Sequence, residues 1–188
     1  MSFELLFVFS IQSCPITSTI NLKEIQECVG YHINLSALAN APTSFRLLNN
    51  PGLGPGSQEF EVATNGEANI RADVERSMRI MSGVKPSGCT PLTEHVWDIN
   101  STIDALKGSL QAEGKRVVIV IATDGLPTNS LGETNEYVKE QFVQSLQALE
   151  GLPVWLVIRL FTDEEKVVVS TCIYIYNMYL YLQYVLLY

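Results

Sequence analysis

Basic residues are scarce in this chain of 188 residues, which carries 12 Lys and Arg against 20 Asp and Glu and has a formal net charge of −8. A chain of this kind repels phosphate backbones and anionic lipid unless its basic residues cluster. The densest basic group, Arg71, Arg76 and Arg79, is interspersed with acidic residues on one predicted helix. Nucleic acid is therefore excluded as an expected partner.

The cysteines are few and far apart. Cys14, Cys28, Cys89 and Cys172 form no CxxC pair and have no histidine at metal-ligand spacing, which excludes a disulfide framework and a zinc site. The first residues are apolar but include Glu4 and lack the basic region of a secretory signal. We therefore expect an intracellular, cytoplasmic protein.

Motifs for nucleophilic catalysis are also missing. Neither Ser87 nor Ser130 lies in a GxSxG turn, and the chain has only two histidines, His32 and His95, to serve as a base. His32 falls on the apolar side of a predicted helix, where a packed core-edge histidine is the simpler interpretation. Cys89 precedes a helix, which can lower a thiol pKa, yet a small buried filler is the favoured interpretation. These absences predict that the protein is not an enzyme.

Hydrophobic residues make up 47% of the chain, enough to bury the core of one domain. Apolar residues recur at three- and four-residue steps over residues 21–39 and 69–83, and again from Leu92 to Leu110, and so predict three helices. Between the first two, β-prone runs flank a dense cluster of turn formers, which predicts a hairpin or a wider β-turn-β connection. Thr90 followed by Pro91 predicts an N-cap and first helical residue.

The second half of the chain alternates strands with helices. Residues 117–122 form an unbroken, largely β-branched run, the pattern of a strand covered on both faces of a parallel sheet. An amphipathic helix carrying Val138 and Phe142 then leads to a second predicted buried strand over residues 154–158. This order predicts an α/β fold with right-handed crossover connections.

Residues 167–188 form an uncharged, tyrosine-rich tail. The segment is long enough to span a bilayer. However, its tyrosines are spread along the whole length instead of lying at the ends, and no basic residue anchors it. A buried strand with its flanks, or an abnormal end of the coding sequence, are the alternatives. Membrane association is thus expected only through this tail.

Two oxygen-bearing side chains mark a candidate metal site. Asp124 follows the strand 117–122, and ligands of open parallel sheets bind beyond the carboxyl ends of strands. Gly125 lets the backbone turn there, and Thr90 offers a hydroxyl at the start of a helix. Both are donors that a hard cation such as Mg²⁺ prefers. The structural alternative is that Asp124 stabilises a turn and Thr90 only caps its helix.

The stretches Ser-Gly-Cys-Thr-Pro-Leu at 87–92 and Ala-Thr-Asp-Gly-Leu-Pro-Thr at 122–128, with the strand at 153–160, resemble successive landmarks of a von Willebrand factor type A domain over residues 21–166. The resemblance implies a doubly wound, mostly parallel Rossmann-like sheet with helices on both faces. It also implies an adhesion-type metal site in which Thr90 and Asp124 bind Mg²⁺ or Mn²⁺. In that family an acidic side chain of a partner protein completes the metal shell, so the resemblance predicts a protein-binding module.

The family's Asp-x-Ser-x-Ser loop, which follows its first strand, has no counterpart, because no Asp precedes residue 22. We therefore expect a domain incomplete at its N-terminus, with residues 1–20 as a separate apolar segment. The alternative is that the run LLFVFSI takes the place of the first strand. Two other functions remain open: a Mg²⁺-dependent hydrolase or phosphoryl-transfer enzyme that uses Asp124, and a degenerate scaffold without metal.

Overall fold

The computed structural model describes residues 3–9, 18–85, 88–162, 164–165, 167–171 and 184–187. Within these residues the chain forms an α/β fold around a six-stranded sheet. The elements, in chain order, are β1 (Phe3–Phe9), α1 (Ser18–Ala39), β2 (Thr43–Leu47), β3 (Glu59–Val62), a 3-10 turn (Glu67–Asn69), α2 (Ile70–Gly83), α3 (Leu92–Ala112), β4 (Arg116–Thr123), α4 (Glu136–Gln147), β5 (Val154–Leu160) and β6 (Tyr184–Leu187).

The strand order across the sheet is β3-β2-β1-β4-β5-β6. All neighbours are parallel except β2 and β3, which form an antiparallel pair with Phe45 opposite Phe60. The predicted hairpin is therefore confirmed, and it forms one edge of the sheet. The chain moves from β1 outward to β2 and β3, and then returns to the other side of β1 to build β4, β5 and β6.

The central strand β1 corrects the expectation that the first strand is missing. Phe3–Phe9 pairs along its whole length with β4, from Phe3 opposite Arg116 to Phe9 opposite Ala122, and with β2 on its other side. The apolar N-terminal run thus fills the sheet centre, because unpaired backbone groups on two neighbouring strands need a partner there. Of the expected N-terminal segment, Phe3–Phe9 accordingly belongs to the sheet.

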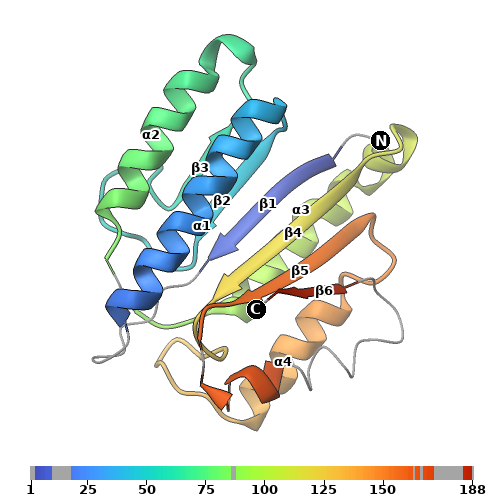
Figure 1. Ribbon diagram of the computed structural model, residues 1–188. Helices are drawn as coiled ribbons and strands as arrows, with labels where there is room; N and C mark the ends of the chain where they lie inside the picture. The colour runs from blue at the N-terminus through green and yellow to red at the C-terminus, as the bar shows by residue number, and fades with distance from the viewer. Residues whose placement is uncertain are drawn as a thin grey trace.

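Helices cover both faces of the sheet (Figure 1). On one face, α1 and α2 pack over β2, β3 and β4 through a core that includes Ile25, Val29 and Phe45. On the other, α3 and α4 pack over β1, β4 and β5 through a core that includes Val96, Leu146 and Leu156. Strand β4 contributes to both cores, which confirms that it is buried on both faces.

Three sequence-based expectations change in detail. Leu106, predicted on the buried stripe of α3, is 47% exposed, because the helix turns this position away from the sheet. Strand β5 alternates buried with half-buried residues, so only one of its faces is fully covered. Part of the tail, Tyr184–Leu187, is an edge strand parallel to β5 and is therefore not detached from the domain.

The predicted membrane segment is only partly described. Residues 167–171 are helical, whereas residues 172–183 lie outside the described residues. Of the helices in the described part of the chain, none is both long and apolar enough to cross a membrane.

Candidate functional site

The carboxyl ends of β1 and β4 lie side by side where the chain reverses its direction of winding. Phe9 at the end of β1 is opposite Ala122 near the end of β4. The connection after β1 leads toward the β2 side of the sheet, and the connection after β4 leads toward the β5 side. Diverging connections leave a crevice at this point, which is where open α/β sheets bind their ligands. Asp124, the first residue after β4, lies at this position.

Asp124 is held on a short, well-ordered turn. Its side chain is buried, with 9% relative exposure. The hydroxyl of Thr123 donates to the carbonyl of Gly125 at 3.0 Å and accepts from the Gly125 amide at 3.2 Å. The Thr123 carbonyl accepts from the Phe161 amide at 3.0 Å, which fixes the turn to the end of β5. The turn that carries Asp124 is therefore held at the carboxyl end of β4.

Thr90 lies on the neighbouring loop, which two hydrogen bonds fasten to the loop of Asp124. The Thr90 amide donates to the Thr128 hydroxyl at 2.8 Å, and the Thr128 amide donates to the Thr90 carbonyl at 2.9 Å. The two predicted metal-site residues thus lie on loops that are joined directly. Thr128 lies in the sequence motif at 122–128, but the sequence alone gave it no role.

The predicted helix cap at Thr90 is wrong. Pro91 occupies the N-cap position of α3, and no side chain caps the helix. The Thr90 side chain is fully buried, and its hydroxyl oxygen has no hydrogen-bond partner among the residues that the structure describes. A buried polar group without a partner costs about 1–3 kcal/mol, so native proteins keep such groups mainly where a ligand, ion or water satisfies them. The hydroxyl is consequently available to a ligand.

The loop before Thr90 is supported from the end of β2. The side-chain nitrogen of Asn49, Nδ2, donates to the Cys89 carbonyl at 2.7 Å. Gly88 adopts a φ of 81°, a conformation that favours glycine. A Cβ at this position would lie 2.7 Å from the Asn49 side-chain oxygen. Sequence reasoning identified Asn49 only as a turn former, because its contact with Cys89 depends on the fold.

We expect Gly88→Ala to lower the free energy of unfolding by about 1–3 kcal/mol, because alanine is strained at this φ and its Cβ displaces Asn49. Chemical denaturation monitored by circular dichroism measures the loss. Gly108→Ala is the matched control: this glycine lies in α3 with open space around it, so alanine there should be neutral or stabilising. Equal stability of wild type and Gly88→Ala would contradict the strained loop geometry.

The candidate catalytic residues that the structure describes do not form a catalytic group. The ring Nε2 of His95 is within 2.9 Å of the Leu48 carbonyl, and burial lowers the pKa of this histidine. The Cys89 thiol donates to the Ser130 carbonyl at 3.8 Å. His32 lies on α1, and Ser87 lies outside the described residues. Within the described ranges we find no group of three or more His, Cys, Asp or Glu side chains that could hold a metal.

A pocket of about 210 Å³ adjoins the two loops on the α3 and α4 side. Thr128 lines it together with Thr93. The hydroxyl of Thr93 is a second buried oxygen for which the described residues provide no hydrogen-bond partner. Trp97 and Tyr137 also line the pocket, with 41% and 69% relative exposure. Exposed aromatic side chains beside a crevice are typical of contact surfaces for other molecules.

No family model matches the chain, and no curated protein matches it in sequence. Among solved structures, the fold is similar to the pilus adhesin SpaC from Lactobacillus rhamnosus GG in its open conformation, with a TM-score of 0.57 and 13% sequence identity. The match covers 94% of this chain and 26% of the adhesin chain. The chain thus spans about a quarter of the adhesin's length, and the likeness concerns the fold alone.

Proposed function

We propose that this chain is a protein-binding module with a doubly wound sheet of von Willebrand factor type A kind. Three observations support the fold assignment: the strand order β3-β2-β1-β4-β5-β6, the antiparallel edge strand β3, and helices on both faces of the sheet. The fold likeness to an adhesin agrees with a binding role. The observation that carries the function is the buried, unpartnered hydroxyl of Thr90 on a loop fastened beside that of Asp124.

We propose that the two side chains form part of a hard-cation site with open positions. The Thr90 hydroxyl and the Asp124 carboxylate would hold Mg²⁺ or Mn²⁺, and both are oxygen donors of the preferred type. A bound metal would supply a positive charge, and an acidic side chain of a partner protein would complete its set of ligands. Trp97 and Tyr137, exposed beside the loops, would supply apolar contacts around that acidic group.

A binding role accounts for the site better than hydrolysis does. Hydrolysis through a metal at Asp124 needs a general base beside it. The next acidic residue on that loop, Glu133, is exposed, and its carboxylate accepts a hydrogen bond from the Asn129 side chain at 3.1 Å. Among the described residues, no catalytic side chain donates a hydrogen bond to it. We propose accordingly that the chain is not an enzyme. An intracellular location remains a proposal based on the separated cysteines.

The test is thermal unfolding of the full chain with and without millimolar Mg²⁺ or Mn²⁺. A ligand that binds only the native state at about 100 times its Kd stabilises it by about 2.7 kcal/mol. For a domain of this size each kcal/mol raises Tm by about 2–4 °C. We therefore expect a metal-dependent rise of several degrees in the wild type and none in Asp124→Ala.

The variant Thr90→Val separates a metal ligand from a structural threonine. Valine has nearly the same shape and removes the unpartnered hydroxyl, so we expect a metal-free protein more stable by up to about 1–3 kcal/mol that no longer responds to metal. Thr90→Ser should keep the response. Glu133→Gln, an exposed acid on the same loop, is the control for general surface charge. A cooperatively folding wild type whose Tm ignores both metals would favour a metal-free scaffold instead.

A further inference from the structure

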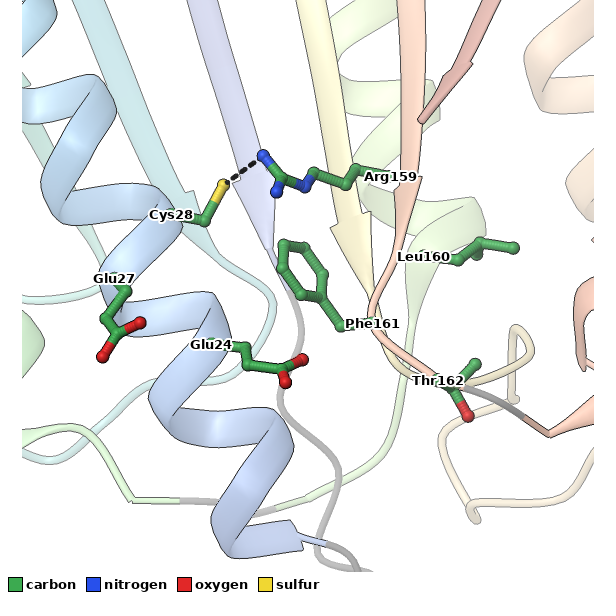
Figure 2. Close-up of a pocket in the computed structure, with 7 residues that line it drawn as sticks. All are labelled: Glu24, Glu27, Cys28, Arg159, Leu160, Phe161 and Thr162. Atoms are coloured by element: carbon green, nitrogen blue, oxygen red, sulfur yellow. Dashed lines mark hydrogen bonds between the residues drawn. The ribbon is translucent and has the colours of Figure 1, made fainter. Parts of the chain in front are cut away.

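A second pocket, of about 380 Å³, lies on the opposite side of β5, between that strand's carboxyl end and α1 (Figure 2). Helix α1 contributes Glu24, Glu27 and Cys28 to its lining. The end of β5 and the residues after it contribute Arg159 and Phe161, among others. The volume matches that of pockets that hold small molecules. None of these residues belongs to the site proposed above.

Arg159 brings a positive charge to this pocket without a carboxylate partner. Its Nη1 donates to the Cys28 sulfur at 3.2 Å, and its guanidinium carbon lies 5.0 Å from the centre of the Phe161 ring. Among the described residues, no carboxylate lies within ion-pair distance of it, and the side chain is only half-buried. A guanidinium has five N–H donors in a planar fork that matches a carboxylate. Within the described part of the chain, one of these donors, on Nη1, is engaged, by the Cys28 sulfur.

The field of this guanidinium reaches other groups. Burial and, to a smaller extent, the positive charge of Arg159 together lower the pKa of His32 to about 4. Burial raises the pKa of the Cys28 thiol, which Arg159 partly opposes. Nearby side chains therefore experience a positive charge that is not neutralised in the folded protein.

A negative charge faces the same space from α1. The carboxylate of Glu24 is turned toward Phe161 and Thr162 (Figure 2) and has no ion pair within the described part of the chain. Its neighbour Glu27 is paired, through Lys23 at 3.8 Å. The pocket thus combines one open positive group, one open negative group and an aromatic ring.

We propose that this pocket binds a small zwitterion of the amino-acid type. Its carboxylate pairs with Arg159, its ammonium group pairs with Glu24, and its apolar body packs beside Phe161. The acidic residues on α1 repel a dianion such as phosphate, so the pocket selects a single carboxylate accompanied by a positive charge. The proposal is independent of the metal site, because it uses other residues.

Ligand-observed NMR titration of the full chain tests this assignment. The probes are glycine, leucine and phenylalanine at up to about 10 mM. The comparison compounds are 3-phenylpropionate, phenethylamine and inorganic phosphate. We expect at least one amino acid to bind, and phenylalanine to bind about tenfold more tightly than the two compounds that lack one of its charges.

Variants connect the binding to the pocket. Arg159→Gln and Glu24→Gln should each weaken binding of the amino acid about tenfold or more. Glu24 is exposed on α1, so its variant retains the fold even if Arg159→Gln does not. Arg79→Gln and Glu67→Gln, exposed and distant in the chain, are the matched controls. The proposal is overturned if no amino acid binds to wild type, if 3-phenylpropionate or phosphate binds as tightly, or if Glu24→Gln leaves the affinity unchanged.

Discussion

Val8→Asp should prevent the domain from folding. Val8 is fully buried on β1, between Arg46 of β2 and Ile121 of β4, and belongs to the core under α3 and α4. An ionised carboxylate there is removed from water, and the neighbouring Arg46 is already paired with Glu59 and Asp98. The burial therefore costs several kcal/mol, an amount comparable to the whole stability of a domain, about 5–15 kcal/mol. Loss of the cooperative unfolding transition, followed by circular dichroism in urea, is the expected result.

Two comparisons make this result specific to the central strand. Val8→Ala keeps the backbone pairing and removes two methyl groups, so it should lower the free energy of unfolding by about 1–3 kcal/mol. Leu131→Asp places the same charge on a residue that is 79% exposed and should change stability by less than about 0.5 kcal/mol. If Val8→Asp unfolds with the wild-type midpoint, β1 does not lie in the sheet centre.

Acidification should destabilise the protein through His32. Its pKa is lowered from 6.5 to about 4 in the folded chain by burial and by Arg159. The unfolded chain therefore takes up the proton first as the pH falls, and the difference in proton binding favours unfolding. The penalty is absent above about pH 6.5, grows down to about pH 4 and is then complete. Each pKa unit corresponds to about 1.4 kcal/mol, so we expect a loss of about 2–3 kcal/mol for this partly buried group.

The experiment compares the pH dependence of unfolding free energy in wild type and in His32→Gln between pH 7 and pH 4. The variant should lose less stability across this range, because the contribution of His32 is gone while that of the carboxylates is unchanged. His95→Gln serves as the second comparison, since burial also lowers the pKa of His95. Parallel curves for wild type and His32→Gln would show that His32 titrates normally in the folded protein.

Much of the fold follows from local patterns in the sequence. The apolar stripe of α3 and the β-branched run of β4 are each long enough to specify a helix and a strand without contacts from neighbouring elements. The hairpin of β2 and β3 is signalled by the turn formers between them. The ends of the elements agree with the predictions because glycines and prolines lie at them.

The strands at the two ends of the described chain were harder to predict. Phe3–Phe9 is a short apolar run that carries Glu4, and its central position depends on pairing with β4 far along the chain. Tyr184–Leu187 lies in a segment whose length and apolarity also fit a membrane span. In both cases the deciding interactions are backbone hydrogen bonds to distant strands, which leave no periodic signal.

The candidate site was predictable only where local sequence patterns mark its residues. Asp124 could be located because the end of a buried strand can be read from the sequence. Thr90 was located from the Thr-Pro pattern at the start of a predicted helix and by resemblance, although its expected cap role was wrong. The supporting residues Thr128 and Asn49 contact the Thr90 loop only in the folded state. Chain separation hides such contacts from any local pattern.

The position of β1 also determines when the sheet can be completed during synthesis. This strand precedes nearly all of the chain, yet one of its two edges pairs with β4, from Phe3 opposite Arg116 onward. Until β4 has left the ribosome, one edge of an apolar strand remains unpaired, and contacts between such distant residues form slowly. Nascent chains that end before β4 should therefore depend on chaperones that shield exposed strand edges.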